Sequence, residues 1–477
     1  MKEFPIADLG TITGAELLAC RSKYGVSSFA GVSTDSRTTK AGDCFFAIAG
    51  ENFDGHDYIS DAFAKGAVCA VVSKDIDSEK SAGKCLVKVD DTIKALGDLA
   101  REYRRQAGYK VVAITGSAGK TTTRQIIYHA LSRRFGVHQS PKSFNNEIGL
   151  SLTLLGAPAE TRIVIAELGS NHPGEIPCLT RIAEPDIAVV TNVHPAHLEG
   201  FGDLQTIIQE KSSISEGLKP DGVFIINGDF DRLVDACRAK GLKFTTFGKS
   251  DGCDCRAGNI RPDGPASRFT VDGTKVYLPL AGPGNIENAM AAWAVCSQFG
   301  LTIDDFAKAI ETLSPVSMRT ELLQIGTLTV LSDCYNANPA SMKNALEILA
   351  NLDPSGQHRK VFICGDMGEL GGQTGRLHAE LGRNIAQAGI KLLLAVGKLA
   401  KIAAEAAQEN ADNYLKIKYF EDTVSAYNNL HEFIKDYDIV LVKGSRVAKL
   451  EMLVEKLNEL FSPSVSREAR SEMREPR

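Results

Sequence analysis

Short apolar runs alternate with segments of helical periodicity through the middle of the chain. The runs 111–115 (VVAIT), 162–168 (RIVIAEL), 186–193 (DIAVVTNV) and 222–229 (GVFIINGD) are typical of short buried strands, and segments between them, such as 121–135, have helical spacing. Strands that alternate with helices indicate a parallel sheet covered by helices on both faces. The pattern therefore predicts a central α/β domain over residues 91–314.

The same alternation restarts after residue 314. Four apolar runs, at 327–335, 360–366, 391–397 and 438–445, are separated by helical segments such as 341–352, which predicts a second doubly wound, Rossmann-like domain over 315–461. At the other end, runs 44–50 and 68–72 lie among Asp, Gly and Ser, which predicts a small α/β domain over 1–90. Residues 462–477 are charged and nearly free of apolar side chains, so a disordered tail is expected. The predicted fold class is thus α/β with three domains.

Composition excludes several classes of protein. The 477 residues are 43% hydrophobic and 24% charged, with a net charge of −5, which fits neither a nucleic-acid-coating protein nor a disordered chain. Eleven cysteines without a CxxC pair indicate neither a disulfide framework nor a zinc finger, and they favour a reducing compartment. No leader and no apolar run of eighteen residues occurs, so we expect a cytoplasmic protein without membrane insertion. No heptad seam is left over, so a monomer is expected.

The strongest chemical signal is TGSAGKTTT at 115–123, between a predicted strand and a predicted helix. Backbone N–H groups at such a turn can hold phosphates, Lys120 would reach the β- and γ-phosphates, and Thr121 would ligate Mg²⁺. Ile114 stands where the longer G-x-x-x-x-G-K-[ST] pattern has its first glycine, so this is the shorter form. The alternative is a glycine turn that only caps a helix. The predicted phosphate-binding positions are Gly116, Ser117, Ala118, Gly119, Lys120, Thr121 and Thr122.

Polar side chains follow the neighbouring strands. Glu167 ends one strand and could ligate a divalent cation or cap the next helix. Segment 191–201 (TNVHPAHLEGF) brings His197 to the sheet edge, where ligands bind in open α/β sheets. Lys211 follows in a helical stretch, and its spacing alone predicts a solvated lysine.

With these pieces the sequence resembles the Mur ligase family from about residue 33 to residue 460. The matching segments are STDSRTTKAGDCFFAIAGENFDGHDYI, TGSAGKTTT, NNEIGLSLTLL, TNVHPAHLEGFG, GNIENAMAAW, DCYNANPASM, GDMGELG and VKGSR. Among them NNEIG, YNANP and GDMGELG point to the branch that joins D-Ala-D-Ala to a UDP-MurNAc-tripeptide. The resemblance implies an ATP-dependent amide ligase that works through an acyl phosphate in peptidoglycan precursor synthesis.

The resemblance also implies roles for individual residues around ATP. Two Mg²⁺ ions are expected near Thr121, Glu167, His197 and Lys211, with Lys211 converted by CO₂ to a carbamate. Arg319 would reach the γ-phosphate and Asp333 the ribose, and Asn285 and Asn288 would lie on the adenine side. The family usually has a polar pair such as Arg-His before that first asparagine, whereas this chain has Pro283-Gly284, which leaves base contacts from those two positions open. The catalytic residues implied are Lys120, His197, Lys211 and Arg319.

The substrate side is assigned in the same way. The UDP-substrate is expected near Ser36, Arg37, Asp54, Gly55 and His56 in the first domain, and near Asn145 and Asn146. For the first group, simple turn chemistry is the alternative, because Asp, Asn, Ser and Gly dominate turns. The dipeptide is expected near Tyr335, Asn336, Asn338, Lys443, Ser445 and Arg446.

Three alternatives to this function stay open at this point. Two are ligases: one that adds the third residue of the stem peptide, and one of the folylpolyglutamate type. NNEIG and YNANP argue against both. The third is a nucleotide-dependent switch protein, which usually carries the full phosphate-loop pattern that Ile114 interrupts here. The sequence does not distinguish meso-diaminopimelate from lysine at the third position of the stem peptide.

Overall fold

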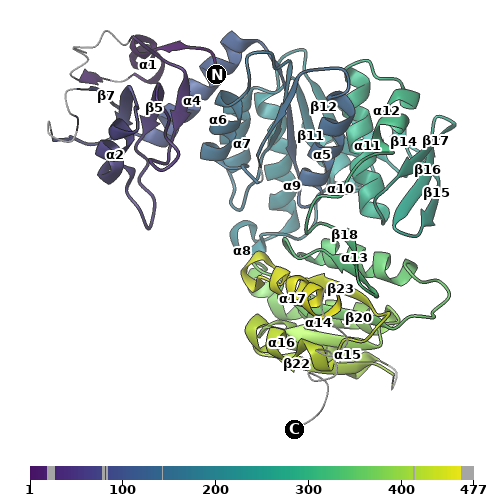
Figure 1. The fold of residues 1–477 in the computed structure, drawn as a ribbon. Helices are drawn as coiled ribbons and strands as arrows, with labels where there is room; N and C mark the ends of the chain where they lie inside the picture. The colour runs from purple at the N-terminus through teal and green to yellow at the C-terminus, as the bar shows by residue number, and fades with distance from the viewer. Residues whose placement is uncertain are drawn as a thin grey trace.

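The computed structural model has three lobes along the chain (Figure 1). It describes residues 1–14, 16–18, 27–77, 81, 84–141, 143–411 and 414–462. The predicted disordered tail lies outside the described residues from 463 onward. Each lobe is built around its own main β-sheet, so the predicted three-domain α/β architecture is confirmed.

The N-terminal lobe contains a five-stranded sheet in the order β2-β7-β6-β5-β4. Strands β4 to β7 are parallel and β2 is antiparallel to β7. A two-stranded ribbon, β1 and β3, lies beside it, together with helices α1 and α2. The bounds are β1 Phe4–Pro5, α1 Ile6–Thr13, β2 Glu16–Leu18, β3 Ser28–Phe29, β4 Gly31–Ser33, β5 Asp43–Phe46, α2 Ile59–Ala64, β6 Cys69–Val72 and β7 Cys85–Lys88.

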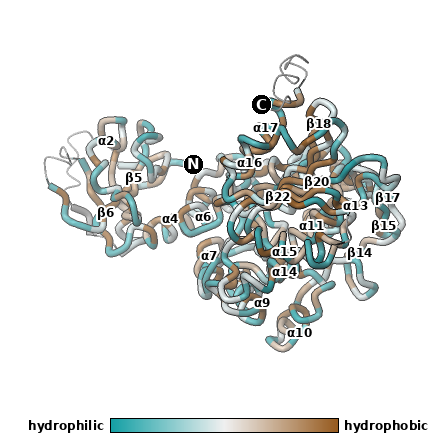
Figure 2. Tube along the Cα trace, turned by 90° about the horizontal axis from the view of Figure 1, so that it is seen from below, coloured by the Kyte–Doolittle hydropathy of each residue, from teal (hydrophilic) through white to brown (hydrophobic). Residues whose placement is uncertain are grey.

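Helix α4 (Thr92–Ala107) joins this lobe to the next. Asp91 starts it by accepting the N–H groups of Ile93 and Lys94, and Gly108, in the left-handed region at φ 72°, ends it. Its apolar face packs in one cluster with residues of the N-terminal sheet and of the central helices. Figure 2 shows the N-terminal lobe standing apart from the rest, with α4 next to α6 at the junction.

The central lobe holds a seven-stranded parallel sheet in the order β14-β13-β12-β11-β8-β10-β9. Because β8 comes first and later strands are added on both of its sides, the order of the strands reverses next to β8, and open α/β sheets bind ligands at such a switch point. The strands are β8 Lys110–Thr115, β9 Val137–Gln139, β10 Ile163–Glu167, β11 Ile187–Val190, β12 Val223–Asn227, β13 Thr245–Gly248 and β14 Cys255–Arg256. The helices are α5 Lys120–Leu131, α6 Glu147–Leu155, α7 Glu175–Ala183, α8 Leu198–Phe201, α9 Leu204–Ser212, α10 Asp231–Ala239, α11 Pro283–Gln298 and α12 Ile303–Ile310.

A separate antiparallel sheet in this lobe was not expected from the sequence. It has the order β15-β16-β17, with bounds Gly258–Asp263, Ala266–Val271 and Thr274–Leu278. Only one of its faces is buried, and β15 is exposed along most of its length, so the segment lacks a continuous apolar run.

The C-terminal lobe has a six-stranded sheet in the order β18-β19-β23-β20-β21-β22. The four predicted strands are parallel, a fifth parallel strand, β22, was not predicted, and the edge strand β18 is antiparallel to β19. The strands are β18 Glu321–Ile325, β19 Leu328–Ser332, β20 Lys360–Gly365, β21 Leu392–Val396, β22 Lys416–Phe420 and β23 Ile439–Lys443, and the helices are α13 Pro339–Asn351, α14 Thr374–Gln387, α15 Ala400–Asn410, α16 Thr423–Asn429 and α17 Glu451–Phe461.

The central and C-terminal lobes share an apolar contact. Leu198 and Phe201 of α8 belong to the same buried cluster as Met367, Leu370 and Leu377 of the C-terminal lobe. Gly371, at φ 52°, lies so close that an added Cβ would come within 3.2 Å of the Glu199 Cα. This contact sets the position of the C-terminal lobe relative to the phosphate loop.

Two further findings concern cysteines and membranes. Nine cysteines of the described chain are free thiols, and Cys85 is disulfide-bonded. Across the described residues, no helix is both long enough and apolar enough to span a bilayer.

Helices α14 and α15 pack closely at Gly382, where an added Cβ would lie 2.3 Å from the Ala403 carbonyl oxygen. We expect Gly382→Val to destabilise the protein by about 2 kcal/mol, because a backbone oxygen cannot move away. Gly375→Ala on the same helix, where nothing lies within 4 Å, is the matched control and should be neutral or slightly stabilising. Thermal unfolding midpoints measure both, and equal midpoints would contradict this packing.

Candidate functional site

The phosphate loop runs from the end of β8 to the start of α5, and two glycines give it its shape. Gly116 has φ 142° and Gly119 has φ 81°. An added Cβ would lie 2.0 Å from the Thr191 Oγ1 at Gly116 and 2.1 Å from the Asn288 Oδ1 at Gly119. Other residues are therefore excluded both by conformation and by space. Because α5 starts directly after Gly119, its first N–H groups face the loop, as anion binding requires.

Side chains of the segment after β11 hold the loop in place. The Asn192 Oδ1 accepts the Ala118 N–H at 2.9 Å, and its Nδ2 donates to the Ala118 carbonyl at 3.2 Å. The Ser117 Oγ donates to the His194 carbonyl and accepts the His194 N–H, both at 2.9 Å. Asn192 was not predicted as a site residue, although its place in the strand-end segment TNVHPAH was the available signal.

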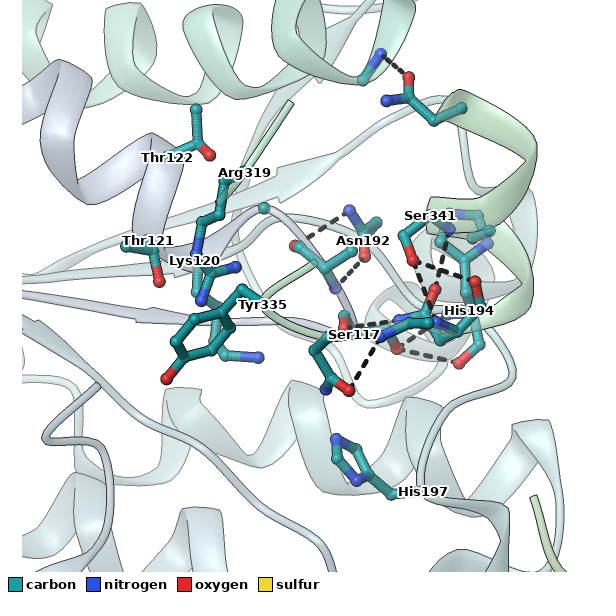
Figure 3. A pocket seen from close by; sticks show the side chains of 18 of the residues that line it. Ser117, Lys120, Thr121, Thr122, Asn192, His194, His197, Arg319, Tyr335 and Ser341 are labelled. Atoms are coloured by element: carbon teal, nitrogen blue, oxygen red, sulfur yellow. Dashed lines mark hydrogen bonds between the residues drawn. The ribbon is translucent and has the colours of Figure 1, made fainter. Parts of the chain in front are cut away.

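Lys120 curls back over the loop and donates to the Gly116 carbonyl at 2.6 Å. Burial lowers the pKa of this amine to about 8. The Arg319 guanidinium lies over the Tyr335 ring, 4.2 Å from its centroid, and Figure 3 shows both beside Lys120. Two cationic side chains from different lobes therefore border the same space, which suits a polyphosphate.

Thr121 and Glu167 form a pair of hard oxygen donors. The Thr121 Oγ1 donates to the Glu167 Oε2 at 3.1 Å, and the Glu167 Oε1 lies 2.9 Å from the Arg124 Nη1. Glu167 is buried and does not cap α7, so the helix-cap interpretation is wrong. One carboxylate plus one hydroxyl fits Mg²⁺, which takes only one or two protein ligands when phosphates and waters complete its shell.

Lys211 is buried, so the interpretation as a solvated lysine is wrong. Only 2% of the residue is exposed, its Nζ donates to the Ser170 Oγ at 2.6 Å, and it lies 5.4 Å from the centroid of the Phe201 ring. Burial, with a smaller contribution from the charge of Lys120, lowers the pKa of this amine to about 7. A substantial fraction is therefore a neutral, nucleophilic amine near pH 7.

His197 lies where the two lobes meet. It adopts the left-handed conformation at φ 52°, and its Nδ1 pairs with the Glu369 carboxylate of the C-terminal lobe. Burial is the main cause of a lowered pKa for this imidazole. No cluster of three or more His, Cys, Asp or Glu side chains able to hold a metal occurs in the part of the chain that the structure describes.

The C-terminal lobe reaches the phosphate loop through the start of α13. The Asn338 Nδ2 donates to the Ser117 carbonyl at 3.3 Å, while the Asn338 Oδ1 caps its own helix at Ser341. Just before it, the Tyr335 hydroxyl hydrogen-bonds to the Ser143 hydroxyl of the central lobe. Asn336 contributes its carbonyl to Lys443, at 3.1 Å.

Asp333 is engaged by protein groups on both oxygens. The Lys443 Nζ donates to its Oδ2 at 2.5 Å, and the Thr320 N–H donates to its Oδ1 at 3.1 Å. Burial raises the pKa of this carboxyl group. A ribose hydroxyl would have to share these oxygens, which their remaining lone pairs permit.

Asn285 and Asn288 connect α11 to the loop. The Asn288 Nδ2 donates to the Asn285 Oδ1 at 3.2 Å, and the Thr123 Oγ1 donates to the Asn288 Oδ1 at 3.3 Å. The Asn285 Nδ2 donates to the Thr320 Oγ1 at 3.0 Å. The two asparagines share a helix face, as their spacing predicted.

These groups surround one cavity of about 1300 Å³ between the central and C-terminal lobes. Most of the predicted residues line it, namely Ser117, Ala118, Gly119, Lys120, Thr121, Thr122, Asn145, Asn146, Glu167, His197, Asn285, Asn288, Arg319, Asp333, Tyr335, Asn336, Asn338 and Lys443. Lys211 lies behind this wall, bonded to Ser170, which does line the cavity. Gly116, Ser445 and Arg446 are not part of the wall, although Arg446 lies 5.8 Å from the centroid of the Tyr335 ring.

The five residues predicted in the N-terminal lobe do not reach this cavity. The Asp54 carboxylate accepts from the His56 N–H at 3.0 Å, from the His56 Nδ1 at 2.6 Å and from Lys74. Lys74 and His56 together hold the pKa of Asp54 well below its usual range. A Cβ on Gly55 would lie 2.6 Å from the Ile48 nitrogen. These contacts show that the FDGH segment has the turn chemistry that the sequence left open.

Arg37 and Ser36 differ in exposure. The Arg37 guanidinium forms a bidentate pair with Asp35, at 2.7 Å for the shortest contact, and lowers the pKa of that carboxyl to about 2. The Arg37 side chain is nevertheless 85% exposed, whereas Ser36 is buried. Arg37 is thus accessible to a ligand from solvent.

A parallel sheet with a phosphate loop at its switch point, and a second Rossmann-like lobe closing over that loop, define a class of three-domain nucleotide-dependent α/β enzymes. Comparison with known families agrees: residues 28–104 match the Mur ligase family catalytic domain, 114–296 the Mur ligase middle domain, and 318–446 the Mur ligase glutamate ligase domain. The chain belongs to the Mur ligase family.

Individual relatives are similar over nearly the whole chain. The UDP-N-acetylmuramoyl-tripeptide–D-alanyl-D-alanine ligase of Bacillus subtilis is 36% identical over 90% of this chain and 93% of that protein, and its namesake from Escherichia coli is 34% identical over the same shares. A crystal structure of MurF from Acinetobacter baumannii superposes with a TM-score of 0.86 at 32% identity, covering 96% of this chain and 99% of the other. MurF ligase from Thermotoga maritima, solved in complex with ADP, has a TM-score of 0.79 at 27% identity, covering 90% and 97%.

Asn192 provides a test of how the loop is held. We expect Asn192→Ala to weaken ADP binding by about tenfold, because the Ala118 N–H and carbonyl lose their partners and the loop is no longer fixed. Calorimetric titration with ADP measures the dissociation constant. Unchanged affinity in a variant with unchanged thermal stability would contradict the role of Asn192 in positioning the loop.

Proposed function

We propose that this chain is an ATP-dependent amide ligase that joins D-Ala-D-Ala to UDP-MurNAc-tripeptide, giving UDP-MurNAc-pentapeptide, ADP and phosphate. The observation that carries the proposal is the convergence of the phosphate loop, the buried Lys211 and the C-terminal YNANP segment around one cavity. Relatives that are 30 to 36% identical over about nine-tenths of the chain bear the name of this activity.

The reaction needs activation because a carboxylate is a poor electrophile. An oxygen of the tripeptide's terminal carboxylate attacks the γ-phosphorus, ADP leaves, and an acyl phosphate forms. The dipeptide amine then attacks the carbonyl carbon and loses a proton. The bond between this carbon and the phosphate oxygen breaks, and phosphate leaves with the bonding electrons. Lys120 and Arg319 border the cavity from opposite lobes and would neutralise the charge on the transferring phosphoryl group. No covalent intermediate on the protein is required.

Two Mg²⁺ ions belong to this proposal. Thr121 and Glu167 are the residues that would hold the first, since their oxygens are already adjacent and buried. His197 and Lys211 would serve the second. When bound, Mg²⁺ supplies charge neutralisation at the phosphates. The chain's own part is to present these donors on β10, α5, α9 and the turn before α8.

The environment of Lys211 favours a carbamate. A neutral amine can add to CO₂, and the resulting carbamate offers oxygen donors at the end of a long stem, which an ammonium group does not. The lowered pKa and the Ser170 hydroxyl, which can hydrogen-bond to the product, both support the modification.

The remaining assignments come from the family resemblance, and most of their residues line the cavity. Asn145 and Asn146 line the arm that faces the N-terminal lobe, so the muropeptide would enter there, with its UDP end near Arg37 in the lobe formed by residues 1–90. The dipeptide would lie near Tyr335, Asn336, Asn338 and the KGSR turn containing Lys443, Ser445 and Arg446. Asp333 would serve the ribose, and Asn285 and Asn288 the adenine side. Substrates of this kind place the reaction in the cytoplasm, and a monomer suffices because one chain supplies every proposed group.

The test of the function is a substrate panel. Purified protein, ATP and Mg²⁺ are incubated with the lysine or the diaminopimelate form of UDP-MurNAc-tripeptide, with and without D-Ala-D-Ala, and phosphate release and product mass are recorded. We expect dipeptide-dependent phosphate release with a matching mass gain for one form. Lys120→Ala should abolish release, because the amine that neutralises the phosphates is lost.

Other outcomes of the substrate panel would indicate one of the three alternative functions. A mass gain only with a UDP-MurNAc-dipeptide and a free amino acid would indicate the ligase that adds the third residue. Glutamate addition to a folate would indicate the folylpolyglutamate type. Slow ATP hydrolysis that ignores every muropeptide would indicate a nucleotide switch.

The carbamate is tested with Lys211→Arg and ¹³C-labelled bicarbonate. We expect a carbamate carbon signal in the wild-type NMR spectrum that the variant lacks, and a loss of turnover of roughly 10²-fold or more. Lys94→Arg, at an exposed lysine, is the matched control and should keep both signal and turnover. A wild-type enzyme that is active in CO₂-depleted buffer and shows no carbamate signal would contradict the modification.

A further inference from the structure

No residue close in sequence caps the N-terminus of helix α11 with its side chain. Its N-cap is Gly282, which has no side chain, and the first helical residue is Pro283, which has no N–H. The next N–H group, that of Gly284, donates a hydrogen bond to the Asn344 Oδ1 on α13 of the C-terminal lobe, at 3.0 Å. The C-terminal lobe therefore supplies the cap of a central-lobe helix.

The glycines make this contact possible. A Cβ on Gly284 would lie 2.9 Å from the Asn344 Oδ1, and a Cβ on Gly282 would lie 2.5 Å from the Ile348 Cγ1. Side chains at either position would push α13 away. The absence of side chains at Gly282 and Gly284 therefore allows the Asn344 amide on α13 to reach the start of α11.

The bond to Gly284 also fixes the orientation of the Asn344 amide. A backbone N–H can pair only with the amide oxygen, so the NH₂ group occupies the other branch of the side chain. Asn344 lines the cavity, and no acceptor for its Nδ2 is found among the residues that the structure describes. The Asn344 NH₂ group is therefore a hydrogen-bond donor at the cavity wall that has no partner among the described residues.

The position of Asn344 lies on the nucleoside side of the cavity. We call two groups of lining residues arms: the first comprises Ile93 of α4, Asn145 and Asn146, and the second comprises Gly284 and Glu287 of α11 and Asn344 of α13. The first arm serves the muropeptide in the proposed function, so the base attached to the phosphates must take the second. In that arm Lys249 and Glu287 already pair with each other at 2.5 Å.

We propose that Asn344 determines nucleobase specificity, by donating a hydrogen bond from its NH₂ group to a ring nitrogen of adenine while its oxygen caps α11. The inference rests on the ATP site of the proposed function. It assigns to the C-terminal lobe a direct contact with the base, so that docking of this lobe and recognition of ATP are one event.

Binding of ADP, measured by calorimetry, tests this inference without using the ligase reaction. The decisive variant is Asn344→Asp, which keeps an oxygen for the Gly284 N–H and loses the NH₂ donor. We expect an unchanged unfolding midpoint and an ADP affinity about fivefold weaker, as for the loss of one hydrogen bond. Asn344→Ala should lower both, because it removes the cap as well. Asn351→Asp, at the exposed end of the same helix, is the matched control for added charge.

Ligand analogues then separate base recognition from lobe docking. The 1-deaza, 3-deaza and 7-deaza analogues of ADP each lack one acceptor nitrogen of adenine, and we expect one of them to bind the wild type and Asn344→Asp equally well. Equal ADP affinity of wild type and variant, or an equal loss with ADP and all three analogues, would overturn the inference. Either result would leave the ligase proposal intact, whereas a wild type that fails to bind ADP would overturn the proposed function itself.

Discussion

The close approach of two segments to the phosphate loop is the constraint on which the rest of the structure depends. Thr191 fills the space where Gly116 would carry a side chain, Asn288 does the same at Gly119, and Asn192 bonds to both polar groups of Ala118. The loop is thus fixed by β11 and α11 as well as by its own strand and helix. A loop that is already ordered binds anions without a further loss of conformational entropy.

The candidate site is built from residues of two lobes, the central and the C-terminal one. Asn338 bonds to Ser117, Tyr335 to Ser143, and Glu369 to His197, while Leu198 and Phe201 pack into the C-terminal cluster. The polar contacts border the cavity and the apolar ones lie beside it, so the joint between the lobes and the wall of the site are one structure. The charges on Lys120 and Arg319 face each other across this joint, which an anionic ligand would stabilise.

Burial explains which parts of the fold could be predicted from the sequence. The strands β8, β10, β11, β12, β19, β20, β21 and β23 are covered on both faces, so each is a continuous apolar run that the sequence displays. Strands β9, β15, β18 and β22 lie at edges or are largely exposed, and their mixed composition gives no such signal.

The functional site likewise has parts that could be predicted from the sequence and parts that could not. The phosphate loop was predictable because glycines, lysine and threonine are local requirements of the turn. The burial of Lys211 was not, because the helical spacing says nothing of Ser170 and Phe201, which come from distant segments. The contributions of Asn192 and Asn344 likewise depend on pairs of residues that only the tertiary structure brings together. In the N-terminal lobe, Asp54 and His56 hydrogen-bond to each other, which is the turn chemistry that the sequence allowed beside a role in substrate binding.

The phosphate loop and the start of α13 line one cavity, which we propose is a single nucleotide site. Amide hydrogen exchange, measured with and without ADP, tests it most directly through two segments, 116–122 and 336–344. We expect amide exchange to slow in both segments together when ADP binds to the wild type, and to slow in neither segment in Lys120→Ala. Slowing confined to 116–122, with 336–344 unchanged at saturating ADP, would contradict a site shared between the two lobes.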